Sequence, residues 1–461
     1  MGMAELLPYI KNMSMKDLVA AAKVTTDQER TRLNSLGYHI GYTAEEWRHT
    51  FPEIDVGKIY YNKGLDSTFY YDQTENILFP IQLFGMVTLQ PKEKFADGIL
   101  KRAEILKTQL RDGNYVSLLL GLQDRMRMEM LDILIKQHPS ETMYALFCDF
   151  YPSSDYGCNA LSINAIKRLR SLKSESQTKK TQDLLKEYPD SVILYRGQGS
   201  QSARWEQAVS WTTDINIANF FASRLESEYG EIHIAEADKK DIIEFFDNEK
   251  ECIVLPENIR RTDMIPVWGR DLLEEQLPQI AHEYQHYREL TMNGVNFTID
   301  DLEHGKLHTF RVILNCLLLA NLKKVSPKER EILCAAAVFH DTRRQNNGED
   351  TAHGEAAAKY FRKFAEEHPD SVAYHKVTEQ LIQYHSLPDS YGRKAVAEEN
   401  QHLYDIFKDA DALDRVRFGI YALDLHQLRT KEAKSMTIIA GQLVRNIRMP
   451  EPTLEQGMEL T

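Results

Sequence analysis

Residues 304–322 read HGKLHTFRVILNCLLLANL, in which two histidines precede a leucine-rich run. The run predicts a buried helix, and His304 and His308 are four residues apart, so they lie on the same face of that helix. Two interpretations are open at this point. Either the histidines face water at a polar helix end, or they contribute to a metal site.

Downstream segments favour the metal site. CAAAVFHDTRR at 334–344 places His340 and Asp341 side by side at the end of an apolar helix. Further candidates follow in HGEAAAKYF, LIQYHS and KDADALDRVRF, namely His353, His385 and Asp411. Imidazoles and carboxylates suit divalent cations such as Mn, Fe, Mg or Zn. An adjacent His-Asp pair can bind one ion or bridge two, and bridged metals activate water and clamp phosphoryl oxygens.

This ordered set resembles the HD-domain phosphohydrolase superfamily over roughly residues 282–430. The motifs are H-x-x-R-V at 308–312, HD at 340–341 and A-D-x-L-D at 410–414. The resemblance implies an all-α bundle that binds one or two divalent ions. It implies four primary metal ligands, His308, His340, Asp341 and Asp411, and two extra histidines of two-metal members, His353 and His385. His353 follows Asp341 by only twelve residues, a short interval for that pattern.

The H-G-x-x-H-x-x-R stretch at 304–311 is also similar to the phosphodiesterase domain of SidE-type bacterial effectors. That similarity implies that His304 contacts phosphate or donates a proton; the alternative is a solvated helix end. Arg343 and Arg344 follow the HD pair and are candidates for holding substrate phosphate. Exposed arginines at a helix end are the alternative explanation for this pair.

The middle of the chain has short β-type runs, SVILYRG, AVSWTT, GEIHIAEA and ECIVLP, with one helix-like segment, IANFFASRLESE. Arg196 ends the first run, and Ser210 and Thr212 lie in the second. Glu249 and Glu251 are two residues apart at the edge of the last run. Side chains two apart in a strand point to the same face, which predicts that both carboxylates address one ligand.

These residues resemble the R-S-E class of ADP-ribosyltransferases over roughly residues 185–262, with NAD as the substrate. The resemblance implies that Arg196 holds the pyrophosphate of NAD, Ser210 positions Glu251 and Thr212 supports the Ser210 strand. Glu251 would stabilise the oxocarbenium-like transition state and Glu249 would serve the acceptor. The E-x-E spacing favours arginine as acceptor by analogy. The interval between Arg196 and Ser210, fourteen residues, is shorter than in many toxins of this class.

Composition and charge exclude several other functions. The formal net charge is -13 and no long Lys/Arg run occurs, so a polynucleotide partner is not expected. Five cysteines without a Cys-x-x-Cys pair argue against a disulfide framework and a Cys-ligated zinc. The apolar stretches are too short to span a membrane, and the N-terminus has no secretion-signal pattern. We therefore expect a cytoplasmic protein, or an effector or toxin-like protein delivered into a host or target-cell cytosol.

The predicted fold is multidomain α+β. It comprises a mostly helical N-terminal region of unassigned role (1–180), a mixed α+β ADP-ribosyltransferase-like module (185–265) and an all-α HD-domain bundle (280–445). The polar stretch SESQTKKTQD at 174–183 is predicted as a loop or linker.

The leading function is a bifunctional enzyme. It combines an NAD-dependent ADP-ribosyltransferase, a glycosyltransferase, with a metal-dependent phosphohydrolase or phosphodiesterase. The second activity would act on a nucleotide or an ADP-ribosylated product, and the acceptor of the first can be a protein, a nucleotide or a small molecule. One alternative is an HD nucleotide phosphohydrolase regulated by a non-catalytic NAD-binding module. The other is a non-catalytic interaction protein.

Overall fold

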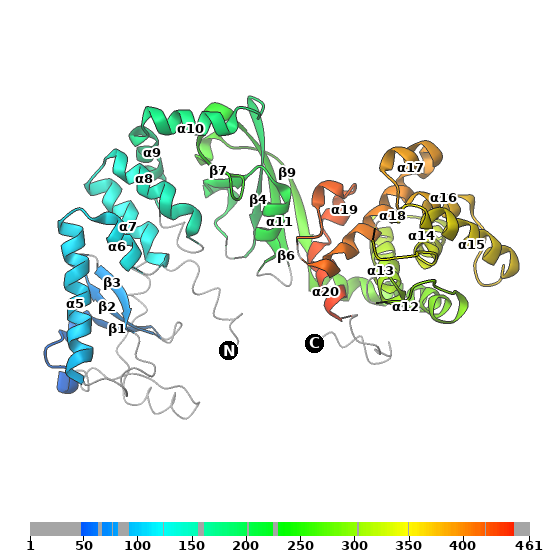
Figure 1. The fold of residues 1–461 in the computed structure, drawn as a ribbon, viewed down its shortest axis with the longest axis horizontal. Coiled ribbons are helices and arrows are strands. Elements are labelled where there is room, and N and C mark those ends of the chain that lie inside the picture. Colours follow the sequence, from blue (N-terminus) through cyan, green and yellow to red (C-terminus); the bar gives the residue numbers. More distant parts are fainter. Residues whose placement is uncertain are drawn as a thin grey trace.

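The computed structural model describes residues 48–62, 67–75, 77–81, 92–122, 124–154, 161–200, 202–224, 229–301, 304–348, 350–419 and 421–446. The chain forms a curved, elongated molecule (Figure 1). A small sheet and several helices occupy one end, an antiparallel sheet with a helix packed on it lies in the middle, and helices alone make up the other end. This arrangement agrees with the predicted multidomain α+β class.

The N-terminal part combines a three-stranded antiparallel sheet, in the order β1-β2-β3, with a series of helices. Its elements are η1 (Val56–Lys58), β1 (Ile59–Asn62), β2 (Ser67–Asp72), β3 (Ile77–Ile81), α5 (Lys92–Arg111), α6 (Tyr115–Gly121), α7 (Asp124–Gln137), α8 (Glu141–Phe150), η2 (Tyr151–Ser153), α9 (Ile163–Leu172) and α10 (Glu175–Leu185). The loop or linker predicted at 174–183 is wrong, because these residues form the start of α10. Ser174 and Gln177 build a capping box there, which satisfies backbone donors that an unprotected helix start would leave open.

The middle of the chain forms a six-stranded antiparallel sheet in the order β7-β8-β5-β4-β6-β9. Its elements are β4 (Ser191–Gln198), η4 (Trp205–Gln207), β5 (Ser210–Thr212), α11 (Ile215–Ser223), β6 (Tyr229–Asp238), η5 (Lys239–Asp241), β7 (Ile242–Phe246), β8 (Glu251–Val254), η6 (Pro256–Asn258) and β9 (Arg260–Trp268). Helix α11 packs tightly on β4 and β6. A Cβ on Gly197 would lie 1.9 Å from the carbonyl oxygen of Ala218, and one on Gly230 would lie 2.3 Å from that of Ala222. The two glycines therefore allow the helix to approach the sheet.

The C-terminal part is helical throughout its described length. Its elements are α12 (Arg270–Glu289), the π-helix η7 (Leu290–Gly294), α13 (Lys306–Leu322), α14 (Pro327–Phe339), α15 (His353–Glu367), α16 (Lys376–Tyr384), α17 (Asp389–Ala395), η8 (Glu398–Asn400), α18 (Gln401–Leu413), η9 (Asp414–Phe418), η10 (Leu425–Gln427), α19 (Lys431–Lys434) and α20 (Thr437–Asn446). Helix α13 contacts α12, α14 and α18 and is buried almost all round, which explains its leucine-rich sequence.

The middle sheet and the C-terminal helices share one apolar core. Ile232 and Val267 of the sheet belong to the same buried cluster as the leucines of α13. Polar contacts reinforce the junction at α11, where Asn216 donates to Asp424 Oδ1 (2.8 Å) and accepts from the backbone N–H of Leu425 (2.7 Å). The sheet is therefore packed against the helices through buried surface.

A buried carboxylate connects the sheet to the N-terminal helices. Glu244 of β7 accepts hydrogen bonds from Tyr144 of α8 (2.7 Å) and Thr181 of α10 (2.6 Å). The ammonium group of Lys173 lies 3.6 Å from the same carboxylate. A buried charge is stable only when it is paired and hydrogen-bonded, and Glu244 has both kinds of partner.

Four described cysteines, Cys148, Cys252, Cys316 and Cys334, are free thiols; Cys158 lies outside the described residues. Cys316 and Cys334 are buried in the helical core. None of the helices in the described ranges is both long and apolar enough to cross a bilayer.

Candidate functional site

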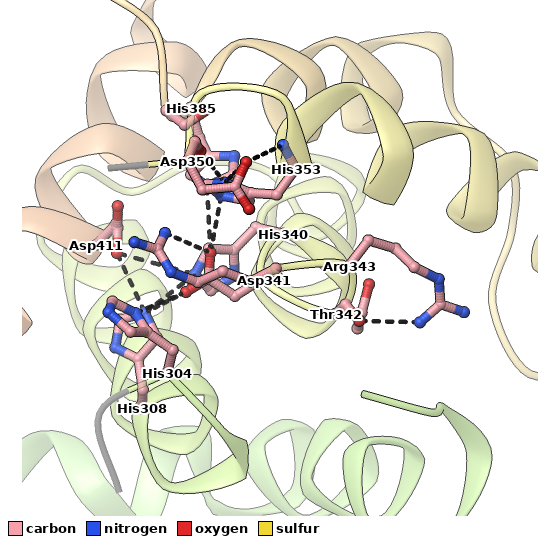
Figure 2. A network of polar contacts seen from close by, with 12 residues as sticks. His304, His308, His340, Asp341, Thr342, Arg343, Asp350, His353, His385 and Asp411 are labelled. Carbon is pink, nitrogen blue, oxygen red and sulfur yellow. Dashed lines mark hydrogen bonds and ion pairs between the residues drawn. The ribbon is translucent and has the colours of Figure 1, made fainter. Parts of the chain in front are cut away.

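The six residues predicted as metal ligands come together where five helices end or begin (Figure 2). His308 lies in the first turn of α13, His340 and Asp341 directly follow α14, and His353 begins α15. His385 follows α16, and Asp411 lies in the last turn of α18. Helix ends suit a ligand-binding site because several segments of the chain can meet there with their side chains directed at one point.

One group of ligand atoms surrounds a first metal position. His308 Nε2 lies 3.3 Å from Asp411 Oδ1 and 3.1 Å from His340 Nε2. The possible ligand atoms of these three residues all lie within 4.8 Å of one another. A tetrahedral ion with bonds of about 2.1 Å has ligand atoms roughly 3.4 Å apart, so the spacing fits a bound ion. Asp411 is 31% exposed, so this position is open to solvent on its side.

A second group lies on the other side of Asp341. Asp341 Oδ1 lies 3.1 Å from His353 Nε2 and 3.4 Å from His385 Nε2. Asp341 Oδ2 lies instead 3.7 Å from His308 Nε2. Figure 2 shows Asp341 between the two sets of imidazoles. One carboxylate oxygen thus faces each set, which is the arrangement that bridging of two ions requires.

His353 follows Asp341 by only twelve residues, and it still reaches Asp341. Hydrogen bonds within the loop turn the chain back toward the site. Arg344 donates to the backbone oxygens of Asn346 (3.0 Å) and Gly348 (2.7 Å). Asp350 Oδ1 then accepts from the backbone N–H of His353 at the start of α15 (3.2 Å). The twelve-residue spacing therefore does not separate the second group from the first.

The hydrogen bonds of the imidazoles fix which nitrogen is available to an ion. In each of the four, Nδ1 is bonded to an oxygen: His308 to Asp414 Oδ2 (2.7 Å), His340 to Ala337 O (2.8 Å), His385 to Ile382 O (2.7 Å) and His353 to Asp350 O. A donating Nδ1 leaves a lone pair on Nε2. The Nε2 atoms of His353 and His385 lie 2.9 Å apart, so two lone pairs face each other. A cation between them would remove that repulsion, and the donor set therefore fits a metal.

The charges at the site favour the same conclusion. Burial lowers the pKa of His340 to about 4, so this imidazole is neutral near pH 7. Burial acts to raise the pKa of Asp341, but His340 and the other histidines outweigh it and hold this pKa well below the usual range. For Asp411, the neighbouring His308 and His340 likewise outweigh burial and lower the pKa. Ionised carboxylates beside the neutral imidazole of His340 form ligands that attract a divalent cation.

His304 joins this cluster. It is buried, and its Nδ1 lies 3.2 Å from Asp341 Oδ2, so the solvated alternative is wrong. The turn that carries it is tight: a Cβ on Gly305 would lie 2.4 Å from Asp300 Oδ1. Glycine at 305 therefore lets the chain enter α13 with His304 next to the HD pair.

Of the two arginines after the HD pair, Arg343 makes its contacts outside the cluster of candidate ligands. Its guanidinium lies 3.4 Å from the ring centroid of Tyr360 and donates to the backbone oxygen of Asn296 (2.6 Å). Figure 2 shows its side chain directed away from the cluster. Arg344 stays nearer, with Nη1 4.0 Å from Asp341 Oδ1, while its other nitrogens bind the loop. This geometry does not support the phosphate role predicted for Arg343.

A comparison with protein families agrees with the site. Residues 307–416 match the HD domain family. The match includes all six predicted metal ligands. HD domains are typical of metal-dependent hydrolases. No curated protein and no solved structure matches the chain. The matched range begins after the middle sheet, so the resemblance of that sheet to an ADP-ribosyltransferase rests on its sequence motifs.

Sequence reasoning missed a supporting pair inside the range that matches the HD domain family. Arg311 Nε donates to Asp414 Oδ1 (2.5 Å) and its Nη2 to Asp414 Oδ2 (3.0 Å). Asp414 in turn accepts from His308, so the pair orients a candidate ligand. Both residues stand in the quoted motifs, as the arginine of H-x-x-R-V and the last aspartate of A-D-x-L-D. Their presence in the motifs was the signal that could have identified them.

In the middle sheet, three of the predicted residues meet on neighbouring strands. Ser210 Oγ donates to Glu251 Oε1 (2.5 Å) across β5 and β8. Arg196 Nη1 donates to the backbone oxygen of Ser210 (2.7 Å). Thr212 donates to the backbone oxygen of Glu249 (2.8 Å), as expected of a residue that supports the strand. Burial raises the pKa of Glu251 to about 7, and the charge of Glu249 adds to this effect.

The expectation that Glu249 and Glu251 share the face of one strand is wrong. Strand β8 begins at Glu251, and Glu249 lies in the preceding turn. Lys250 between them has φ 49°, a left-handed conformation that breaks the two-residue alternation. The two carboxylates are still close enough for the charge of Glu249 to act on Glu251.

Proposed function

We propose that the HD domain is a metal-dependent phosphohydrolase or phosphodiesterase. The observation that carries this proposal is the position of Asp341, with one carboxylate oxygen toward His353 and His385 and the other toward His308. The four Nδ1 hydrogen bonds, which leave every Nε2 available to an ion, support it independently.

Each group has a role in this proposal. Bound divalent ions would polarise a phosphoryl oxygen and lower the pKa of a bound water. His308, His340, Asp341 and Asp411 would hold one ion, and Asp341 with His353 and His385 would hold a second. Asp341 faces Nδ1 of His304, which leaves Nε2 of that imidazole as the nitrogen that can exchange a proton with the leaving oxygen.

The test compares metal content and hydrolysis of bis(p-nitrophenyl) phosphate between the full chain and its Asp341→Ala variant. Because Asp341 serves both groups, the variant should retain little metal and lose at least about 10²-fold in rate, as expected when electrostatic stabilisation is removed. Asp370→Ala is the matched control, since Asp370 is an exposed aspartate after α15. Equal metal content in the two variants would contradict the proposal.

A second activity is supported by one specific contact. Ser210 donates to Glu251, and Arg196 is bound to the backbone of Ser210. We propose that this group of residues is the site of an NAD-dependent ADP-ribosyltransferase in which Arg196 holds NAD and Glu251 stabilises the oxocarbenium-like transition state. Glu249 would serve the acceptor, for which a protein side chain is our proposal. An ADP-ribosylated product contains a pyrophosphate, which is a bond of the type that the HD domain would cleave.

Nicotinamide release from NAD tests this second activity separately. Glu251→Gln should lower the rate by about 10²-fold or more while NAD binding persists, because glutamine is nearly isosteric but uncharged. Glu257 is an exposed glutamate just after β8, and Glu257→Gln should leave the rate of nicotinamide release unchanged. Phosphodiester hydrolysis without nicotinamide release would favour an HD phosphohydrolase with a non-catalytic NAD-binding module. The absence of both would favour an interaction protein.

A further inference from the structure

A buried histidine of the middle sheet has no hydrogen bond. His233 of β6 is 2% exposed, and neither of its ring nitrogens has a hydrogen-bond partner among the described residues. Its Nε2 lies 2.9 Å from Glu231 Oε2, but this close contact falls outside hydrogen-bond geometry. A buried polar group without a partner is costly, so its presence requires an explanation, and a bound ligand is one.

The charges around His233 determine which of its nitrogens is available to a ligand. Burial lowers the pKa of His233, and the charges of Arg261 and Arg196 act in the same direction. These effects outweigh the opposing charge of Glu231, so the imidazole is neutral near pH 7. A neutral imidazole carries one proton, and the nitrogen beside the Glu231 carboxylate is the favourable place for it. Nδ1 is then left with a lone pair, as a buried hydrogen-bond acceptor.

Neighbouring residues hold Glu231 and the imidazole in place. Gln198 of β4 is the register partner of Glu231, and its Nε2 donates to Glu231 Oε2 (3.3 Å). The side-chain oxygen of Gln198 accepts from the backbone N–H of Trp205 (2.9 Å). The ring centroid of Trp205 lies 6.0 Å from that of His233, and the guanidinium of Arg261 lies 5.2 Å from the Trp205 centroid. These contacts position the carboxylate and the ring in the absence of a ligand.

His233 lies beside Arg196, which would hold the pyrophosphate of NAD in the proposed transferase. The two residues are register partners on neighbouring strands, so their side chains share one face, with Cβ atoms about 4.5–5.5 Å apart. In the strand order β8-β5-β4-β6, Glu251 lies two strands from Arg196 on one side and His233 lies one strand away on the other. The pyrophosphate of NAD has a ribose at each end, and the bond that breaks belongs to the nicotinamide ribose. An NAD molecule with that ribose at Glu251 would extend its adenosine ribose toward β6.

We propose that His233 selects NAD over NADP at this site, because its Nδ1 accepts a hydrogen bond from the 2′-hydroxyl of the adenosine ribose. NADP has a phosphate at that position, so it offers no donor to Nδ1 and brings negative charge close to Glu231. A site that binds a substrate hydroxyl discriminates against analogues that lack it, since the buried acceptor is then left unpaired. The inference rests on the proposed transferase function and adds the residue that determines its dinucleotide specificity.

The experiment measures binding of three ligands to the full chain by calorimetry: NAD, NADP, and the NAD analogue that lacks the 2′-hydroxyl of the adenosine ribose. The wild-type chain should bind NAD about 10-fold more tightly than either of the other two, equivalent to about 1.4 kcal/mol. This comparison requires no variant, so it tests the inference even if a substitution at the buried position 233 prevents folding.

Variants of His233 then assign the preference to this residue. His233→Leu should weaken NAD binding about 10-fold and leave binding of the 2′-deoxy analogue unchanged, because leucine has no acceptor. His233→Asn should retain most of the preference for NAD, since the side-chain oxygen of asparagine can take the position of Nδ1. His282→Leu is the control, because His282 is an exposed histidine on α12. A merely structural role of His233 would change the binding of both ligands by the same factor.

Two results would overturn the inference: a wild-type chain that binds NAD and NADP equally tightly, or a His233→Leu variant in which NAD and the 2′-deoxy analogue weaken equally. Nicotinamide release is measured on the same proteins. Release of nicotinamide without discrimination by His233 rejects the role of this residue alone. Discrimination without release supports the role of His233 and rejects the proposed transferase. A chain that does not bind NAD rejects both.

Discussion

Asp414 accepts a hydrogen bond from His308 Nδ1 at 2.7 Å, although the two residues are 106 positions apart in the chain. The same carboxylate forms a bidentate pair with Arg311. His308 is therefore held by a buried ion pair that lies outside the set of candidate metal ligands.

Asp414→Leu should lower metal affinity by about 10- to 100-fold, because loss of a partner that orients a ligand usually has that effect. It should also lower the free energy of unfolding by about 3–5 kcal/mol, since Arg311 remains buried without its partner. The double variant Arg311→Met/Asp414→Leu should recover much of the stability but not the metal affinity. Recovery of both quantities together would show that Asp414 acts only through folding.

His385→Ala should remove one ion and leave the other. His385 faces Asp341 Oδ1, whereas the first position is built from His308, His340 and Asp411. Elemental analysis of wild type and variant should therefore show a fall from about two ions per chain to about one, with the histidines and carboxylate of the first position intact. An unchanged metal content would contradict the second position.

Nicotinamide release should rise with pH through neutrality, because Glu251 must be ionised to stabilise positive charge. With its pKa raised to about 7, the ionised fraction grows from about one-tenth at pH 6 to about nine-tenths at pH 8. The hydrogen bond from Ser210 opposes this rise in pKa, so Ser210→Ala should move the midpoint to higher pH. A pH profile that is flat from 6 to 8, or a midpoint that Ser210→Ala moves downward, would reject this role.

Glu244→Leu should weaken the attachment of the N-terminal helices to the sheet. The change leaves Lys173 and Tyr144 without their buried partner, at a cost of about 3 kcal/mol in the free energy of unfolding. Burial acts to raise the pKa of Glu244, but its hydrogen bonds from Thr181 and Tyr144 lower it overall. Its contribution is therefore present above the pKa of an unfolded glutamate and is lost as the pH falls through the lowered value.

Urea unfolding monitored at several pH values checks this prediction. Glu257→Leu is the control, because Glu257 forms an exposed pair with Lys167 and its loss should change stability by less than about 0.5 kcal/mol. Equal destabilisation by the two substitutions would mean that the buried network contributes no more than a surface pair.

The convergence of the candidate metal ligands was predictable because these residues stand in short motifs at helix ends. His308, His340 and Asp411 could be identified without knowing how the helices pack, since the order of the motifs already indicated one site. The ion pair between Arg311 and Asp414 was harder to find, because 103 residues separate the partners and only packing of α13 against the end of α18 brings them together.

Local backbone conformation explains the errors. Glu249 was assigned to a strand because the two-residue alternation of side chains was extended beyond the first residue of β8. The left-handed conformation of Lys250 ends that alternation. The start of α10 was missed because its residues are polar, although Ser174 and Gln177 carry a capping-box pattern. Arg343 follows the HD pair in sequence, but the chain turns its side chain toward Tyr360. Neither a left-handed residue nor the direction of a side chain after a helix end can be read from hydrophobic periodicity.

The shared core around α11 has a kinetic consequence for a two-step enzyme. Asn216 joins α11 to Asp424 and Leu425, and the leucines of α13 pack in one cluster with the sheet, so buried contacts hold the two candidate sites in fixed positions relative to each other. A modified acceptor would have to dissociate from one site and bind again at the other. The intermediate should therefore accumulate in bulk solution before it is consumed, and excess unlabelled intermediate should dilute a labelled one during the reaction.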